Sequence, residues 1–347
     1  MRNLILPFIL LLTFVFSCRE NSNDDVLEKK NPSYDVYIAG TENNKACYWK
    51  NTIKTELTNG DNINTMDIKV ENNDVYVTGV LITNTTDNGI QYFWKNNIRT
   101  DVKQYLSIPN NVQYDINSFT INNGDVYFAG YVENPAATNT LDRFELCYWK
   151  NGVKTILYKS QYISTVKSIL VDGSDVYVSV TKVDNNQNAE KGYYKNTVFN
   201  SISTTHLVFN FIKNNNGIHL LIFKNNAYYS FNINSNTETI LGGYILPVIS
   251  GKLISDKLTN DLYMIYNDGG EYYKNTTLVT PNSYQLPYIK DLFVLGNNIY
   301  MIKYKFELGY NAKVLINGVA SQDISGTFQN GNPYYTGTFN SIYVVEN

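Results

Sequence analysis

The sequence predicts an all-β chain, a β-propeller that is best described by seven blades of four strands each. Three observations lead to this prediction. One strand-like motif returns at nearly regular intervals, and an aromatic segment that ends in a tight turn lies between its copies. No segment after residue 32 shows the hydrophobic period of a helix over 11 residues or more. Repeats of this length are typical of solenoids and propellers, whose units bury their faces against their neighbours.

The first motif reads Asp-Val-Tyr, or a close variant of it, and it occurs eight times. The copies begin at Asp35, Asp74, Asp125, Asp175, Gly217, Asp261, Asn298 and Ser341. The intervals between them run from 37 to 51 residues, with a mean near 44. That period suits one four-stranded propeller blade. The strands are rich in Tyr, Val, Ile, Phe and Thr on both faces, as expected of blades that pack against a neighbour on each side.

The second motif is an aromatic pair followed by Lys-Asn. The clear copies are Tyr48-Trp49-Lys50-Asn51, Phe93-Trp94-Lys95-Asn96, Tyr148-Trp149-Lys150-Asn151, Tyr193-Tyr194-Lys195-Asn196 and Tyr272-Tyr273-Lys274-Asn275. Asn and Gly tolerate the positive φ that a two-residue hairpin turn requires. Each repeat therefore reads as a four-strand meander with a tight turn after its third strand.

The eighth copy of the first motif suggests how the ring closes. We expect the C-terminal strands, near 334–339 and 342–345, to join the same blade as the N-terminal strands. The extra copy leaves one strand more than seven blades of four require. An eight-bladed ring and a redundant edge strand therefore stay open as alternatives.

The N-terminus reads as a targeting segment, residues 1–17, because Arg2 precedes an apolar run that is too short to span a bilayer comfortably. The run ends at Val15-Phe16-Ser17-Cys18, which resembles the lipobox of bacterial lipoproteins. That resemblance implies cleavage before Cys18, diacylation of its sulfur and acylation of the new amine. Residues 18–32 are polar and charged, as expected of a flexible tether, and residues 33–347 form the predicted propeller.

With these motifs the chain resembles Bacteroidota lipoproteins that carry Tyr-Trp-Lys-Asn-Gly propeller repeats. The resemblance implies a location at the bacterial outer membrane, with the lipid anchor as the contact to the membrane. The acidic residues Glu20, Asp24 and Asp25 loosely resemble a surface-export signal. Because a solvated linker is also acidic, the cell surface and the periplasmic face both remain open.

Composition excludes some functions and leaves others. The formal net charge is −3, so the chain lacks the excess of basic residues that would predict a nucleic-acid partner. No metal site or cofactor motif is predicted: the only two histidines, His206 and His219, have no supporting spacing. His219 replaces the Tyr of the first motif and should pack as that Tyr does. The segment 184–190 lacks the Gly and Glu of a calcium loop and should be a solvated loop.

Repetition itself argues that several reactive residue types serve the fold. The Asp of the first motif should bond backbone amides in a turn, and the Lys of the second motif should be a solvated hairpin residue. Cys47 and Cys147 occupy equivalent slots two blades apart. Because a disulfide needs Cα atoms within about 7 Å, we expect two buried free thiols without a nucleophilic role.

The sequence contains no catalytic constellation, so the leading interpretation is a binding or scaffold protein of the cell envelope with a protein or glycan partner. Loops carry function disproportionately, and the long variable ones are 81–89, 133–143 and 183–191. One alternative is a carbohydrate-active hydrolase that uses rim carboxylates; another is a subunit of an outer-membrane complex. The acids that break the repeat are Asp115, Asp142, Glu145, Asp291 and Glu307.

Overall fold

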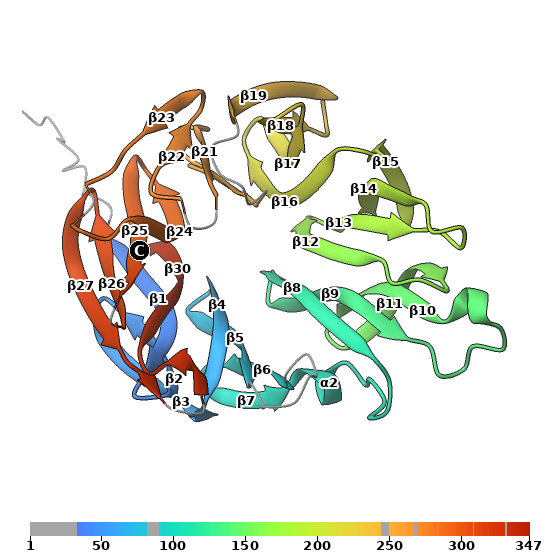
Figure 1. Cartoon of the computed structure of the whole chain (residues 1–347), viewed down its shortest axis with the longest axis horizontal. Helices are drawn as coiled ribbons and strands as arrows, with labels where there is room; N and C mark the ends of the chain where they lie inside the picture. Colours follow the sequence, from blue (N-terminus) through green and yellow to red (C-terminus); the bar gives the residue numbers. More distant parts are fainter. Residues whose placement is uncertain are drawn as a thin grey trace, which may run out of the picture. The chain divides into compact units, whose positions relative to one another are not determined.

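The structure is a computed structural model that describes residues 33–81, 90–243, 250–266, 269–282, 284–307, 309–329 and 332–347. Within these ranges, Asp35–Val345 form one compact unit. It contains seven four-stranded antiparallel sheets that follow one another around a ring, the arrangement of a β-propeller (Figure 1). The predicted fold is therefore confirmed, with seven blades. The predicted signal segment, the tether and Cys18 lie outside the described residues.

Each blade runs from an innermost first strand to an outermost fourth strand. In this order, blade 1 consists of β30 (Thr338–Glu346), β1 (Tyr34–Glu42), β2 (Lys45–Lys50) and β3 (Ile53–Asp61), and blade 2 of β4 (Ile63–Glu71), β5 (Asp74–Leu81), β6 (Ile90–Lys95) and β7 (Ile98–Asp101). Blade 3 consists of β8 (Tyr114–Asn122), β9 (Asp125–Glu133), β10 (Phe144–Lys150) and β11 (Val153–Ser160). Blade 4 consists of β12 (Thr165–Asp172), β13 (Asp175–Val183), β14 (Ala189–Lys195) and β15 (Val198–Ser203).

The same order holds in the other three blades. Blade 5 consists of β16 (Leu207–Asn214), β17 (Gly217–Lys224), β18 (Ala227–Asn232) and β19 (Thr237–Gly243). Blade 6 consists of β20 (Lys252–Ser255), β21 (Leu262–Ile265), β22 (Tyr272–Lys274) and β23 (Thr277–Val279). Blade 7 consists of β24 (Tyr288–Leu295), β25 (Asn298–Phe306), β26 (Tyr310–Ile316) and β27 (Val319–Gly326). A small hairpin, β28 (Phe328–Gln329) and β29 (Asn332–Tyr335), precedes the closing strand.

Blade 1 closes the ring with strands from both ends of the chain, as the sequence predicts, but it takes one C-terminal strand and not two. The predicted strand near 334–339 is divided between β29, which pairs with β28 in the separate hairpin, and the start of β30. Its first strand is β30, and its other three strands are β1 to β3. The eighth copy of the first motif, at Ser341, lies in this closing strand, whereas the other seven copies lie in the second strand of each blade. The extra copy is therefore neither an eighth blade nor a redundant edge strand.

The core lies between adjacent blades because alternate residues of a strand point to opposite neighbours. In β5, for example, Tyr76 packs toward blade 3, whereas Val75 and Val77 pack toward blade 1. Trp94 and Trp149 are fully buried in these interblade layers. This packing explains why the strands read as apolar on both faces.

Helix is confined, in the described ranges, to the single-turn α2 (Val102–Tyr105) and the 3-10 turn η1 (Thr140–Asp142). The sequence did not predict α2. Asp101 caps it by accepting a hydrogen bond from the backbone N–H of Gln104 at 3.1 Å, and Val102 is buried in the layer between blades 2 and 3. No helix of the described chain has the length and apolar character needed to cross a bilayer.

The two sequence motifs meet in a repeated cluster that fixes the tight turn of each blade. In blade 3, Asn151 accepts a hydrogen bond from the backbone N–H of Val126 at 2.8 Å and donates one to Asp125 at 2.7 Å. Lys150 pairs with the same carboxylate at 2.7 Å and lies over the ring of Tyr127. Blades 1, 2, 4 and 6 repeat the Asp–Asn–Lys contacts.

This cluster corrects two details of the sequence interpretation. The backbone amide is bonded by the Asn side chain and not by the Asp. The Lys is an ion-pair partner as well as a solvated residue, because its ammonium lies near the Asp carboxylate and the Tyr ring. Asn151 and Gly152 both have positive φ, of 48° and 81°, as a two-residue hairpin turn requires.

Replacing Asn151 with Gly should lower the free energy of unfolding by about 1–3 kcal/mol, because the buried N–H of Val126 loses its acceptor while the turn conformation is kept. Urea denaturation followed by circular dichroism measures the change. Asn236→Gly is the matched control: Asn236 also has positive φ, and its side chain makes no hydrogen bond to the described chain. Equal stability of the two variants would contradict the role of the cluster.

The topology gives the propeller two distinct ends. The tight turns between first and second strands, and those between third and fourth strands, lie at one end, which we call the turn end. The connections between second and third strands, together with those between blades, lie at the other, which we call the loop end. The loops 133–143 and 183–191 lie at the loop end; of the predicted loop 81–89, residues 82–89 lie outside the described residues.

Candidate functional site

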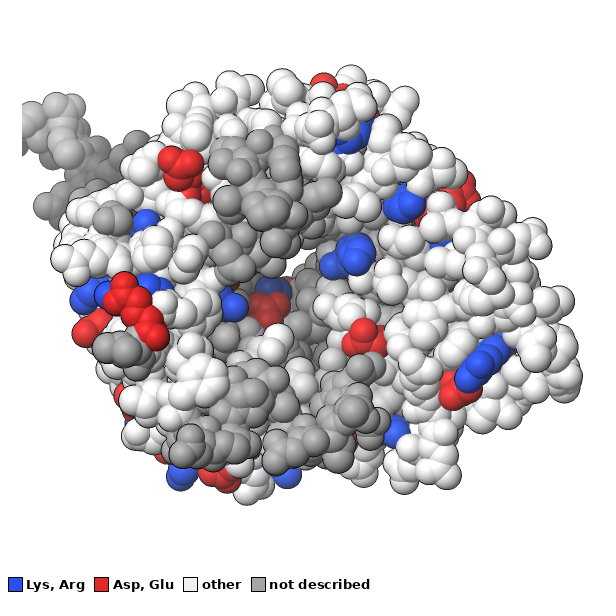
Figure 2. Space-filling model, in the orientation of Figure 1, with Lys and Arg blue, Asp and Glu red and all other residues white. Residues whose placement is uncertain are grey.

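Polar side chains project from the first strands and join the blades around the channel. In five blades a polar residue lies on the first strand, seven residues before the second strand begins. These residues, in blades 2, 3, 4, 5 and 7, are Asp67, Ser118, Ser168, Asn210 and Asp291. In most of these strands the pairing register shifts next to this position, a bulge that redirects the side chain. Figure 2 shows acidic and basic side chains inside the central hollow.

Four of these side chains bond the backbone of the following blade, and we call this set the girdle. Each accepts a hydrogen bond from a backbone N–H of the next blade's first strand, at 2.7–3.1 Å. The pairs are Ser118 with Ile169, Ser168 with Phe211, Asn210 with Leu253 and Asp291 with Ile342. The girdle satisfies buried backbone donors and couples neighbouring blades.

Of the five polar positions, the one in blade 2 makes no girdle bond to the following blade, which is blade 3. The residue at the girdle position of blade 2 is Asp67, and the corresponding donor in blade 3 would be the N–H of Phe119. No hydrogen bond joins the two in the described chain. Asp67 Oδ1 instead accepts from Ser341 of blade 1 at 2.7 Å and from the backbone N–H of Ile68 at 2.9 Å, and Oδ2 accepts from the ammonium of Lys69 at 3.0 Å. The blade 2–3 interface therefore lacks a girdle bond, although Glu71 and Gln91 of blade 2 still bond the backbone of blade 3.

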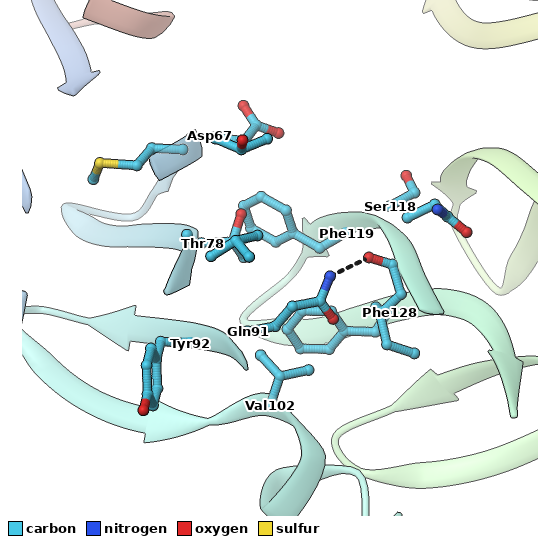
Figure 3. Close-up of a pocket in the computed structure, with 14 residues that line it drawn as sticks. Asp67, Thr78, Gln91, Tyr92, Val102, Ser118, Phe119 and Phe128 are labelled. Carbon is cyan, nitrogen blue, oxygen red and sulfur yellow. Dashed lines mark hydrogen bonds between the residues drawn. The ribbon is translucent and has the colours of Figure 1, made fainter. Parts of the chain in front are cut away.

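A cavity of about 220 Å³ occupies this interface. Its wall combines apolar and polar groups from both blades and from the start of α2. The lining residues are Thr65, Met66, Asp67, Thr78, Gly79, Val80, Gln91, Tyr92, Val102, Ile116, Asn117, Ser118, Phe119 and Phe128. Figure 3 shows Asp67 and Val102 on opposite sides of the space, with Phe119 and Gln91 between them.

Gln91 contributes an acceptor that lacks a partner in the described chain. Its amide nitrogen donates to the carbonyl oxygen of Ile116 at 2.8 Å, which orients the side chain (Figure 3). The other amide atom, Oε1, is buried and receives no hydrogen bond from described residues. A buried acceptor without a donor is costly, so it indicates a position where a ligand or a water donates a hydrogen bond.

Asp67 is ionised at neutral pH. Burial opposes its ionisation, but the ammonium groups of Lys69 and Lys252 and the hydroxyl of Ser341 outweigh burial and hold the pKa of Asp67 below its ordinary value. The residue lies deep in the ring, yet 41% of its side-chain surface is accessible, because the channel brings solvent to it. Its Oδ2, which accepts only from Lys69 within the described chain, can therefore accept a further hydrogen bond from a molecule in the pocket.

Aromatic rings form the apolar part of the wall. The rings of Phe119 and Phe128 are stacked, with centroids 6.0 Å apart, and Lys69 lies over Phe119 at 5.6 Å. Rings of this kind pack against the apolar face of a ligand while polar groups fix its orientation. The pocket thus offers an apolar wall with hydrogen-bond acceptors beside it.

The five acids that break the repeat do not share one site. Asp115 bonds Asn117 on β8, and Asp142 lies in η1. Glu145 is buried and pairs with two lysines of β11, whereas Glu307 lies in the turn after β25, beside Lys305. Asp291 holds the N–H of Ile342 and pairs with Lys252 on the innermost strands of blades 1 and 6.

The other residues that the sequence analysis discussed serve the packing and the turns of the blades. Cys47 and Cys147 are free and fully buried, as predicted, and burial raises their pKa values to about 11 and about 12. His219 is buried on β17 in the slot of the repeated Tyr, with Nδ1 2.8 Å from the hydroxyl of Ser230. Asp184 closes the 184–188 turn, and no cluster of metal-ligating residues occurs in the described ranges.

Comparison with known proteins gives matches in structure only. No family model matches the sequence, and no curated protein matches it. A prolyl endopeptidase structure matches with a TM-score of 0.50 at 10% identity, covering 88% of this chain and 50% of that one. Apo AztD from Citrobacter koseri matches with a TM-score of 0.42 at 11% identity, covering 91% and 98%.

A third solved structure that the chain resembles is a puromycin-hydrolyzing peptidase of Mycobacterium tuberculosis. It has a TM-score of 0.49 at 9% identity and covers 84% of this chain and 50% of that one. These likenesses concern the fold alone. The propeller spans only half the length of either peptidase chain.

Proposed function

We propose that the protein is a non-enzymatic binding protein of the bacterial cell envelope, anchored by lipid on Cys18, which holds a hydroxylated ligand such as a glycan ring. The ligand site is the pocket between blades 2 and 3. The observation that carries this proposal is that Asp67 makes no girdle bond to blade 3: its carboxylate lines a cavity, whereas the other four girdle residues bond the next blade. The unpartnered Oε1 of Gln91 lines the same cavity.

The chemistry of the wall supports a ligand that donates several hydrogen bonds. The carboxylate of Asp67 and Oε1 of Gln91 are both acceptors. Phe119 and Phe128 add an apolar surface beside them. A sugar ring combines hydroxyl donors with an apolar face, so it matches both parts of the wall. The volume of about 220 Å³ is below the 300–1,000 Å³ usual for ligand pockets, which favours a single ring.

The position of the pocket supports binding from the loop end. It is lined by Thr65 and Met66 of β4, Thr78 and Gln91, all of which lie in the half of blade 2 nearest the loops. A ligand therefore enters from the side where the variable loops 133–143 and 183–191 lie. We place the protein at the outer membrane; the pocket is compatible with both the cell surface and the periplasmic face.

Asp67→Asn should weaken binding of the cognate sugar about tenfold to a hundredfold, because a hydrogen bond to a charged acceptor contributes about 1.5–3 kcal/mol. Gln91→Met, which keeps the shape of the side chain, should weaken it about threefold to tenfold. Saturation-transfer NMR over a panel of monosaccharides identifies the ligand, and calorimetry measures the dissociation constant.

Asp323→Asn is the matched control, since Asp323 is an exposed acid on the outer strand β27 of blade 7, outside the pocket. It should leave binding unchanged. Thermal unfolding checks that each variant folds. If no sugar binds saturably, or if Asp67→Asn and the control bind equally well, the proposed ligand site is wrong.

A further inference from the structure

The turn end of the propeller carries a repeated set of exposed aliphatic side chains. Each is the first residue of a fourth strand, directly after the Asn-containing turn, and each exposes about two thirds or more of its surface. The set, which we call the aliphatic arc, is Ile53 (73%), Ile98 (73%), Val153 (70%), Val198 (65%) and Val319 (66%). These residues belong to blades 1, 2, 3, 4 and 7, which are consecutive around the ring.

The fold does not require aliphatic residues at this position. In blade 6 the equivalent residue, which pairs with Lys274 as Ile53 pairs with Lys50, is the exposed Thr277. In blade 5 the turn closes at Thr237. Since the same hairpin forms with a polar residue, the aliphatic side chains call for an explanation outside the fold. Single exposed aliphatics are ordinary, but five at equivalent places on one end of a ring form a common surface.

The chain enters the propeller at this same end. The backbone N–H of Val36, at the start of β1, bonds Asn51 of the tight turn at 2.8 Å, and the N–H of Asn51 bonds the carbonyl oxygen of Val36 at 2.9 Å. Residues 18–32 precede this point in the sequence. The sequence predicts that they form a flexible tether, and a flexible chain of that length spans roughly 20 Å. A bilayer that holds lipid on Cys18 is therefore within reach of the turn end.

We propose that the aliphatic arc inserts into the headgroup boundary of the membrane that holds the anchor, so that the propeller lies with its turn end on the bilayer. The inference rests on the proposed lipid anchor and is independent of the proposed ligand. Aliphatic side chains that reach a membrane surface bury apolar area in this boundary. The pocket near the loop end then faces away from the membrane.

The charges at the turn end indicate how this contact should respond to lipid charge. The lysines that precede the arc, Lys50, Lys95, Lys150 and Lys195, each pair with the Asp of the repeat. The cluster therefore adds no net positive charge to the surface. We expect insertion in zwitterionic bilayers, with little dependence on anionic lipid or on salt.

Site-specific labelling of the full lipidated protein tests the inference. A polarity-sensitive dye is attached to Val153→Cys in the arc or, as the matched control, to Leu141→Cys, an exposed residue at the loop end. Cys47 and Cys147 are fully buried and should not react with the dye. In phosphatidylethanolamine vesicles, with or without phosphatidylglycerol, the dye at 153 should shift to the blue and be quenched severalfold more by lipid-borne quencher than the dye at 141.

A second variant separates insertion from proximity. The combined variant Ile98→Thr, Val198→Thr and Val319→Thr introduces the residue that blade 6 carries at this position. It should stay folded and anchored but reduce quenching of the dye at 153 severalfold. Anchored protein whose two dyes respond alike overturns the inference alone. Protein that does not stay with the vesicles overturns the anchor and the inference together. A blue shift at 153 without vesicles, growing with protein concentration, assigns the arc to a second copy and also overturns it.

Discussion

A chain that ends at Gly337 should fail to fold cooperatively, because it lacks β30, the first strand of blade 1. The strand buries Phe339, Ile342 and Val344 almost completely. Each buried side chain of this kind contributes roughly 1.5–3 kcal/mol, whereas a whole domain is stable by only roughly 5–15 kcal/mol. Circular dichroism melting and limited proteolysis measure the loss.

The closing strand also holds both neighbouring blades. Phe339 packs edge-on against Trp49 with centroids 5.2 Å apart, and its carbonyl oxygen accepts from the hydroxyl of Tyr310 in blade 7 at 3.0 Å. Ser341 donates to Asp67 of blade 2, and the N–H of Ile342 donates to Asp291 of blade 7. Truncation therefore removes contacts on both sides of blade 1 and exposes the unpaired edge of β1.

A circular permutant is the control for this truncation. The backbone N–H of Asn347 donates to the carbonyl oxygen of Ser33 at 2.9 Å, so the two ends of the described chain are adjacent. A chain that begins at Thr338, passes from Asn347 into Ser33 and ends at Gly337 keeps every strand. It should melt cooperatively. A truncated chain that melts as the full-length protein does would show that ring closure does not depend on β30.

The blade architecture could be predicted from sequence because each blade repeats the same local chemistry. The Asp-Val-Tyr strand and the Lys-Asn turn mark the second and third strands, and both motifs meet in one cluster, as Asp125 and Asn151 do in blade 3. The place of Ser341 was harder to assign. First and second strands are both buried on two faces, so a copy of the motif does not reveal which of the two it occupies.

The candidate pocket could not be predicted in the same way. Asp67 matters because it does not bond the neighbouring blade, and a contact between blades is not visible along one strand. Sequence contains part of the signal: Asp67 lies seven residues before Asp74, at the spacing that Ser118 has from Asp125 and Asp291 has from Asn298. Gln91 has no such signal, since its role follows from the carbonyl of Ile116 on another blade.

The second large effect is expected at Cys18. The sequence resemblance predicts that this residue carries the lipid and marks the cleavage point. Several acyl chains hold a protein firmly, whereas one chain binds only marginally, because each buried methylene contributes about 0.8 kcal/mol. Loss of the thiol removes the first acylation and with it the processing that follows.

Cys18→Ala should therefore yield protein that either leaves the membrane fraction or keeps residues 1–17 and no acyl chains, and intact mass spectrometry of fractionated cells distinguishes the two. Cys47→Ala is the matched control, because Cys47 is fully buried in blade 1 and its loss affects packing and not anchoring. Cys47→Ala should stay in the membrane fraction with its acyl mass. Unchanged mass and unchanged fractionation of Cys18→Ala would rule out the anchor, and with it the orientation in which the aliphatic arc meets the bilayer.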